Sequence, residues 1–198
     1  MLRTRVLQRM RSHGWKKLAI TSARMGAGKT LSAINAAISL AQEANQQVIL
    51  VDLDLRKPKV ASYLGLQSQF GVSDFLLRGV PLERVILAPN IPRLFVVPNY
   101  ERLEDSSEML ASALMRQLVE TLVATADSTI VLFDLPPLLD ADDMLAFSTH
   151  VDAVLFVIAQ GETRRGDVVQ SMELIKDMNL LGTVLNKSSD KAPAYSYY

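Results

Sequence analysis

Cysteine is absent from this 198-residue sequence, and histidine occurs only at His13 and His150. Without cysteine there is no disulfide, no thiolate nucleophile and no cysteine-ligated metal, and two isolated histidines disfavour a histidine-based metal site. Long apolar runs are also missing, since the most apolar stretch, 151–159, contains Asp152 and is far shorter than the roughly 20 residues that span a bilayer. Because the first residues lack the apolar core of a secretory signal, we expect a cytoplasmic protein without a membrane-spanning segment.

Acidic residues are missing from the first 42 positions, although the net charge of the whole chain is zero. Such a basic end favours phosphates, anionic lipid headgroups or nucleic acid as partners, and it is equally typical of a solvated helix face. Trp15 is the one aromatic residue there that could stack on bases, so we predict no nucleic-acid partner. The bases of this segment are Arg3, Arg5, Arg9, Arg11, Lys16, Lys17, Arg24 and Lys29.

Short apolar runs alternate with helical patterns along the chain. A continuous apolar run is typical of a strand buried on both faces of a parallel sheet. Helical periodicity marks 31–41 and 110–122, and Asp105 with Glu108 has the spacing of a capping box that would open the second helix. The pattern predicts an α/β fold of three layers with a mostly parallel sheet. The predicted strands are 18–21, 48–51, 94–97, 129–133, 151–158 and 181–185.

The length and the 49% hydrophobic content suit one globular domain, and no repeat or linker divides the sequence. The stretch 58–99 has the least regular pattern, so we expect short helices and loops there. Residues 187–198 show no core periodicity and are expected to form a flexible tail. We therefore expect one domain over 1–186, followed by that tail.

A glycine-rich segment, Ala-Arg-Met-Gly-Ala-Gly-Lys-Thr, occupies 23–30 and joins the first predicted strand to the helix after it. Glycines let backbone N–H groups point inward, and the helix N-terminus adds partial positive charge. Lys29 would reach the β- and γ-phosphates, and Thr30 would offer its hydroxyl to Mg²⁺. The strict pattern has glycine where Ala23 stands, but the order of strand, loop and helix predicts a nucleotide-binding P-loop. The predicted nucleotide contacts are Gly26, Ala27, Gly28, Lys29, Thr30 and Leu31.

Carboxylates follow two of the predicted strands. Asp52 and Asp54 come directly after the second strand, and Asp134 comes after the fourth. In an open α/β sheet, ligands bind at the carboxyl ends of the strands, and a carboxylate there can hold Mg²⁺, usually through water. An acid that ends a buried strand is often only a helix cap, but three of them beside a phosphate loop favour a metal site. We predict that Thr30, Asp52 and Asp134 hold Mg²⁺.

Asn186 and Lys187 end the last predicted strand and are similar to the base-reading element of GTPases. That element also needs an aspartate two residues after the lysine, where Ser189 stands, and Asp190 comes one position late. We therefore predict that Asn186 contacts the nucleotide and that the base is adenine, which makes ATP the expected nucleotide.

Together these motifs resemble the family of bacterial protein-tyrosine kinases (BY-kinases) that control capsule and exopolysaccharide chain length and export. The resemblance covers nearly the whole chain and includes a tyrosine-rich C-terminus. It implies the fold of dimerising, partition-type P-loop ATPases with deviant Walker motifs. The matching segments are the glycine loop at 23–30, Asp-Leu-Asp-Leu-Arg-Lys-Pro at 52–58, Ser-Glu-Met-Leu-Ala-Ser at 107–112, and Asp-Leu-Pro-Pro at 134–137 with Asp142 after it.

The resemblance also implies an activity, that of an ATP- and Mg²⁺-dependent protein-tyrosine autokinase that regulates exopolysaccharide or capsule polymerisation and export. It implies activation by a membrane-anchored polysaccharide co-polymerase, which would hold this chain at the inner face of the cell membrane as a peripheral protein. Contacts between the tail of one copy and the site of another would make it a homo-oligomer. The oligomerisation motif of the family, Glu-x-x-Arg-x-x-Arg, would end near Arg3, so its Glu and first Arg lie before Met1 or are absent.

The matched motifs also suggest catalytic roles. Lys29 would hold the phosphates, and Asp52 would accept or orient the proton of the tyrosine hydroxyl, because a phenol with a pKa of about 10 needs a nearby carboxylate or metal to become nucleophilic. Asp54 would assist at the metal or as base. Arg56 and Lys57 would neutralise charge on the transferred group.

The last four residues hold three of the five tyrosines of the chain. Exposed tyrosines on a tether are what an acceptor segment requires, because each hydroxyl must enter the site of another subunit. Tyr195, Tyr197 and Tyr198 are therefore the predicted autophosphorylation sites, whereas Tyr63 and Tyr100 are expected to serve packing.

Two other functions fit parts of the sequence. A dimerising ATPase of the partition or division-site type would share the loop and Asp134, and Arg24 falls where such ATPases carry their signature lysine. That class would not need a tyrosine tail. A non-catalytic nucleotide-binding regulator is the third possibility.

Overall fold

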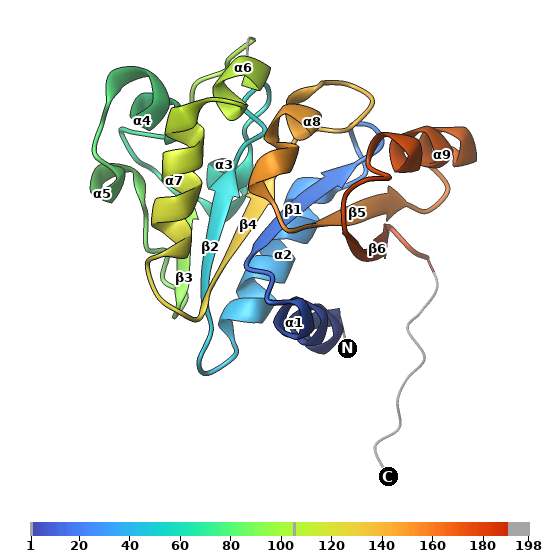
Figure 1. Ribbon diagram of the computed structural model, residues 1–198, viewed down its shortest axis with the longest axis horizontal. Coiled ribbons are helices and arrows are strands. Elements are labelled where there is room, and N and C mark those ends of the chain that lie inside the picture. The colour runs from blue at the N-terminus through green and yellow to red at the C-terminus, as the bar shows by residue number, and fades with distance from the viewer. Residues whose placement is uncertain (1, 105, 190–198) are drawn as a thin grey trace.

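The core of the molecule is one sheet of six parallel strands, as seen in a computed structural model that describes residues 2–104 and 106–189 (Figure 1). The strands are β1 (Lys17–Ser22), β2 (Gln47–Asp52), β3 (Leu94–Val97), β4 (Thr129–Asp134), β5 (Ala153–Ala159) and β6 (Leu180–Asn186). Their order across the sheet is β3-β2-β4-β1-β5-β6. The register sets Asp52 at the end of β2 opposite Asp134 at the end of β4, so the predicted carboxylates meet at one edge.

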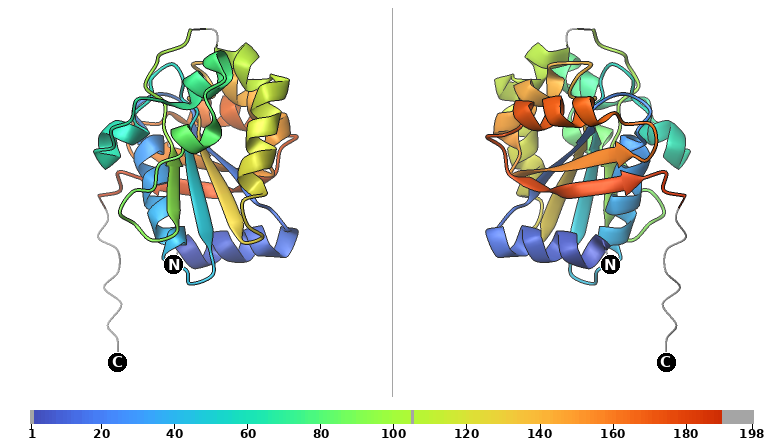
Figure 2. Two further views of the ribbon diagram at one scale, coloured as in Figure 1. Left: turned by 90° about the vertical axis from the view of Figure 1, so that its left-hand side faces the viewer. Right: turned by 90° about the vertical axis from the view of Figure 1, so that its right-hand side faces the viewer.

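Helices cover both faces of this sheet, and the predicted three-layer α/β fold is confirmed (Figures 1 and 2). Alternate strand residues enter opposite layers, as Leu18 and Ala19 do, which is why the strands are apolar without interruption. The helices of one layer are α1 (Leu2–His13), α2 (Lys29–Ala41) and α3 (Val60–Leu64), and those of the other include α7 (Ala113–Val123), α8 (Asp143–Phe147) with the short η1 (Ser148–His150), and α9 (Arg165–Leu174).

Burial on both faces is confirmed for the central strands but is wrong for β6. Nearly every residue of β1, β2, β4 and β5 is buried. In β6, Leu180 and Leu185 are 40% and 57% exposed. The reason is that β6 is an edge strand that pairs only with β5, so fewer neighbours cover it.

The helix predicted over 110–122 is two helices. The first, α6 (Ser106–Leu110), ends before Ser112, and α7 begins at Ala113. The hydroxyl of Ser112 accepts a hydrogen bond from the backbone N–H of Met115 at 3.1 Å, so Ser112 is the N-cap at which a new helix begins. The predicted cap at Asp105 lies outside the described residues.

Short helices and loops occupy most of 58–99, as predicted, and they are α3, α4 (Val72–Arg78) and α5 (Leu82–Val85). The expectation that Tyr63 and Tyr100 serve packing is wrong, because these side chains are 56% and 39% exposed. Helix α3 is little more than one turn long, so it buries Val60 and Ala61 and leaves Tyr63 outside.

None of the helices in the described part of the chain is long and apolar enough to cross a membrane. The predicted acceptors Tyr195, Tyr197 and Tyr198 lie outside the described residues.

Candidate nucleotide-binding and active site

The glycine loop makes a tight turn between β1 and α2. Gly26 and Gly28 have φ angles of 88° and 84°, in the left-handed region that side chains with a Cβ rarely adopt. Gly28 is the N-cap of α2, so the unpaired N–H groups of the first helical turn open toward the loop. A Cβ at Gly28 would also stand 2.1 Å from Asn186 Nδ2. The loop therefore has the geometry of a phosphate cradle, and it requires glycine at position 28.

Lys29 begins α2, and its side chain turns inward toward carboxylates. The ammonium Nζ lies 2.7 Å from Asp54 Oδ2 and 3.5 Å from Asp134 Oδ1, and the residue is 8% exposed. Burial opposes the charge of Lys29, but the Asp134 and Asp54 carboxylates outweigh it and raise the lysine pKa. Lys29 therefore stays protonated beside the loop.

Asp52 and Asp134 lie side by side and are fully buried. Asp52 Oδ2 accepts hydrogen bonds from the backbone N–H groups of Lys59 and Val60 at 3.0 and 2.9 Å, which fixes the start of α3. Asp52 Oδ1 and Asp134 Oδ2 are buried without a hydrogen-bond partner among the described residues. Burial, and then the neighbouring Asp134, raise the pKa of Asp52 well above its usual range, and burial raises the pKa of Asp134.

These unpartnered oxygens fit a hard divalent cation. Asp52, Asp54 and Asp134 surround the single positive charge of Lys29, so the cluster keeps an excess of negative charge. The Thr30 hydroxyl lies in the same cluster, 3.5 Å from Lys29 Nζ. Within 2–104 and 106–189, no group of three or more His, Cys, Asp or Glu side chains is arranged to enclose a metal by itself. The chain could therefore supply part of a Mg²⁺ shell, leaving the remaining positions for phosphate oxygens and water.

A pocket of about 340 Å³ opens in front of the loop. Its wall includes the cations Lys57 and Lys59 and the acid Asp54, while the half-exposed side chains of Leu31 and Tyr63 supply its apolar part. The predicted nucleotide contacts that line it are Gly26, Gly28, Lys29, Thr30, Leu31 and Asn186. The structure thus brings these residues together although they come from both ends of the chain.

Asn186 reaches the loop from the end of β6. Its Nδ2 donates a hydrogen bond to the backbone oxygen of Ala27 at 2.9 Å. Ala27 is buried and does not line the pocket, so it contributes to the site through its backbone. The bond ties the last strand to the phosphate loop.

Two of the predicted catalytic residues, Asp52 and Arg56, do not line the pocket. Asp52 is buried beneath it, and Arg56 pairs with another acid. Its Nε and Nη2 lie 3.3 Å from Oδ1 of Asp143, a fully buried carboxylate that also accepts a hydrogen bond from Ser106. Asp142, which belongs to the matched motif, is exposed and occupies the N-cap position of α8 without a capping hydrogen bond from its side chain. No local pattern marks Asp143, because its partner is 87 residues away in the chain.

Asp140 fixes the start of the loop, although nothing in the sequence distinguishes it from other surface acids. Its Oδ2 accepts a hydrogen bond from the backbone N–H of Met25 at 3.0 Å. Its Oδ1 lies 3.3 Å from Nη1 of Arg24, whose Nε lies 3.3 Å from Asp167. Arg24 is therefore held between two acids, on the side of the loop toward α9.

Comparison with known proteins places this site in a family. The family model described as "AAA domain" matches residues 15–187. The tyrosine-protein kinase YwqD of Bacillus subtilis is 32% identical over 186 residues, which are 92% of this chain and 77% of the relative. A fold of this family with this loop binds nucleotides.

Solved structures show the same fold. The crystal structure of the VpsO kinase domain has a TM-score of 0.84 and 28% identity, covering 94% of this chain and 91% of that one. The septum site-determining protein MinD of Pyrococcus horikoshii, in complex with Mg-ADP, has a TM-score of 0.71 and 21% identity, covering 89% of this chain and 73% of that one, and shows the fold alone. Since the relatives named tyrosine kinases match nearly the whole chain, and the phosphate loop, Lys29 and the buried carboxylates meet in one site, this chain belongs to the family of bacterial protein-tyrosine kinases.

Proposed function

We propose that this protein is an ATP-dependent protein-tyrosine autokinase of a capsule or exopolysaccharide system. The observation that carries the proposal is the buried cluster of Lys29 with Asp54 and Asp134 directly behind a phosphate loop, in a chain of the tyrosine-kinase family. Catalysis of phosphoryl transfer depends on positioning the reactants and neutralising their charge more than on covalent chemistry by the protein. This cluster can contribute to both the positioning and the charge neutralisation.

In the proposed reaction, Lys29 and the loop amides hold the β- and γ-phosphates of ATP. Thr30, Asp52 and Asp134 hold Mg²⁺, which when bound neutralises charge on the phosphates. The two unpartnered carboxylate oxygens support this assignment, because neither has a hydrogen-bond partner among the described residues. Among the nucleotides, we propose ATP because the residue that would read guanine is missing at Ser189.

The proton acceptor for the tyrosine hydroxyl is one of two carboxylates. The raised pKa of Asp52 suits a base, but Asp52 is fully buried and does not line the pocket. Asp54 lines the pocket and is 7% exposed, so an incoming hydroxyl can reach it. We therefore propose that Asp54 accepts the proton and that Asp52 serves the metal. Lys57 and Lys59, which line the pocket where Arg56 does not, would neutralise charge on the transferred group.

The division of the chain is part of the same proposal. Residues 1–186 form the kinase domain and 187–198 the acceptor tail, with Tyr195, Tyr197 and Tyr198 as the acceptors. The tail of one copy would enter the site of another, which implies a homo-oligomer. A membrane-anchored polysaccharide co-polymerase would activate the kinase and hold it at the inner face of the membrane.

Incubation of the pure protein with Mg-ATP, followed by intact-mass analysis, tests the proposed activity against its two rivals. Added phosphates indicate a kinase. Release of ADP without added phosphate indicates an ATPase of the partition type, with which the chain shares its fold. If neither occurs, the protein is a nucleotide-binding regulator.

Replacing Tyr195, Tyr197 and Tyr198 with Phe tests the acceptors. We expect phosphate incorporation to fall to a small fraction while ATP hydrolysis and the unfolding temperature stay unchanged, because the core of the described residues is built without these tyrosines. Mixing a Lys29→Met chain that keeps its tail with an active chain whose tail is Phe should place label on the former. Label that persists on the triple-Phe chain alone would contradict the acceptor assignment.

A further inference from the structure

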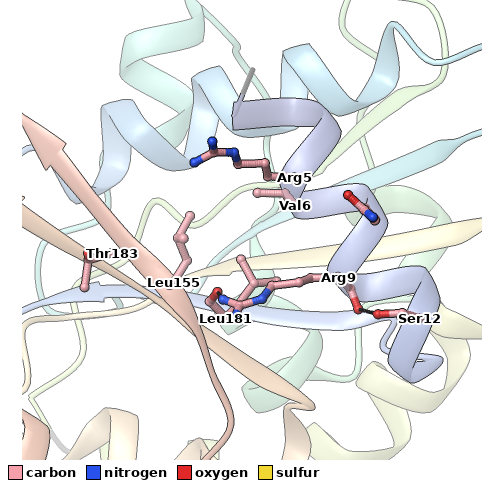
Figure 3. A pocket seen from close by; sticks show the side chains of 9 residues that line it. Arg5, Val6, Arg9, Ser12, Leu155, Leu181 and Thr183 are labelled. Carbon is pink, nitrogen blue, oxygen red and sulfur yellow. Dashed lines mark hydrogen bonds between the residues drawn. The ribbon is translucent and has the colours of Figure 1, made fainter.

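A second cavity, of about 620 Å³, lies between α1 and the edge of the sheet, away from the nucleotide pocket. Helix α1 forms one wall with Arg5 and Arg9, and β5 and β6 form the other with Leu155 and Leu181–Thr183 (Figure 3). This cavity shares no lining residue with the nucleotide pocket, and Figure 2 shows α1 at the opposite end of the molecule from α6. The groove is therefore a site of its own, and we call it the α1–β6 groove.

The α1–β6 groove carries positive charge without a matching acid. Arg5 and Arg9 are exposed, and no acidic residue lines the cavity. Arg9 donates a hydrogen bond to the backbone oxygen of Leu181, which holds its guanidinium at the groove, and Arg5 forms no ion pair with any residue of 2–104 or 106–189. By contrast Arg3, on the same helix, lies 3.8 Å from Glu43. The guanidinium of Arg5 is thus available to an anion, and Arg9 keeps its other N–H groups for one.

Beneath the two arginines the groove is apolar. Val6, Leu155 and Leu181 line it and are nearly fully buried, so their few exposed atoms face the cavity. Thr183 adds a hydroxyl at the rim of the groove (Figure 3). Guanidinium forks bind phosphate in a bidentate manner, and an aromatic ring prefers an apolar surface with cations nearby. Phosphotyrosine combines both parts in one side chain.

We propose that the α1–β6 groove binds phosphotyrosine in the C-terminal segment of this chain. The proposal rests on the proposed kinase function, in which one copy would produce that group on the tail of another. Length permits it: Leu181 and Asn186 are about 17 Å apart along β6, and the nine residue steps from Asn186 to Tyr195 can span up to about 30 Å. A phosphorylated tail held in the groove would be withdrawn from the nucleotide pocket, so product would not compete there with the next acceptor.

A fluorescent peptide with the sequence of 187–198 tests the proposal when it is synthesised with phosphotyrosine at 195, 197 and 198. The full-length Lys29→Met chain, which cannot phosphorylate itself under the proposed mechanism, is titrated into it and anisotropy is measured. We expect binding at least tenfold tighter than that of the unphosphorylated peptide or of a peptide carrying phosphoserine at the same positions. Because the phosphate is added by synthesis, the result does not depend on kinase activity.

Substitutions then locate the site. Arg5→Gln should weaken phosphopeptide binding at least tenfold without altering the fold, since Arg5 has no ion pair within the described residues, and Arg9→Gln should act in the same direction. Arg11→Gln is the matched control, because Arg11 is exposed on the same helix but does not line the groove. Equal losses for Arg11→Gln and Arg5→Gln, or equal binding of phosphorylated and unphosphorylated peptides, would overturn the proposal. It would also fail if Arg5→Gln abolished binding to phosphatidylglycerol vesicles and left the peptide unaffected, which would indicate a membrane surface.

Discussion

The edge of the sheet where the strands end has two halves, which meet at the phosphate loop and are built from opposite kinds of side chain. At the ends of β2 and β4 stand Asp52 and Asp134, both acidic groups with no exposed surface. At the end of β6 stands Asn186, a neutral and partly exposed amide that makes a 2.9 Å hydrogen bond to Ala27. The buried acids of the first half lower the free energy of unfolding, and the hydrogen bond of the second half raises it.

This difference indicates where the chemistry lies. Burying two carboxylates side by side is unfavourable unless a cation compensates them, and Lys29 supplies only one positive charge. Such an arrangement is retained where it binds or reacts with something, because a merely structural site is better built from neutral groups. The amide half of the edge has no comparable strain and is suited to positioning.

Lys29→Met should have the largest effect on activity, because it removes the cation that pairs with the carboxylates of the acidic half. Both ATP turnover and phosphotyrosine formation should fall by at least about 1,000-fold, because the one buried cation that would face the β- and γ-phosphates is lost. The free energy of unfolding should fall too, since three carboxylates then lack their common partner. ADP release and anti-phosphotyrosine blots measure the first effect, and thermal unfolding measures the second. Phosphotyrosine that survives in the variant would place the active site elsewhere.

Gly28→Ala changes the phosphate loop where the two halves meet, and we expect it to have the second largest effect on function. A Cβ there meets Asn186 Nδ2 at 2.1 Å and must also adopt a φ of 84°. We expect nucleotide affinity, measured with a fluorescent ATP analogue, to fall by more than about tenfold. Gly26→Ala is the matched control, because it has a similar φ of 88° but open space around the new Cβ.

The double variant Gly28→Ala with Asn186→Ala sharpens this prediction. It removes the clashing amide, so it should bind nucleotide more tightly than Gly28→Ala, but more weakly than Gly26→Ala by the roughly fivefold expected for the lost hydrogen bond of Asn186. If the double variant binds no better than Gly28→Ala alone, contact with Asn186 is not the cause.

Asp52→Asn should have a smaller effect on stability, and it should stabilise the nucleotide-free protein, whereas most substitutions of buried residues destabilise a fold. A carboxyl group whose folded-state pKa is raised above its unfolded value destabilises the fold at any pH above both values, and this penalty vanishes as the pH falls below the unfolded value. Near neutral pH, neutral asparagine should therefore raise the free energy of unfolding of the nucleotide-free protein by on the order of 1 kcal/mol. The gain should shrink as the pH falls toward 3.8, the ordinary value for aspartate. Mg²⁺-dependent nucleotide binding should be lost at the same time.

Asp143→Asn provides the contrast. Asp143 is as buried as Asp52, but it is paired with Arg56 and Ser106. Its replacement should destabilise the protein by about 1 kcal/mol or more, because an ion pair and its hydrogen bonds are weakened. Urea unfolding of both variants measures the two signs. A loss of stability in Asp52→Asn would mean that the buried carboxylates are not in conflict.

The sequence predicted the acidic half of this edge better than the rest of the site, for a physical reason. A carboxylate directly after a buried apolar run is placed by the strand itself, so Asp52 and Asp134 could be located from the run that precedes each. The contacts of Arg24 and Arg56 join loops to helices far away in the chain, and no periodicity in the sequence marks them. The exposure of β6 escaped prediction for a similar reason, since an apolar run does not show whether its strand has one neighbour or two.

Asn186→Ala should have the smallest effect and leaves the acidic half intact. It removes one partly buried hydrogen bond to Ala27, which is worth about 1 kcal/mol, so nucleotide affinity should fall by roughly fivefold. Turnover at saturating ATP should be nearly unchanged, because Lys29 and the carboxylates keep their positions. Asn179→Ala is the matched control: Asn179 Nδ2 also donates to a backbone oxygen at 2.9 Å, that of Asp152, but it does not line the nucleotide pocket. Equal nucleotide affinity in the two variants would show that Asn186 only ties β6 to the loop, whereas a large loss of turnover in Asn186→Ala would show that the two halves of the edge do not act separately.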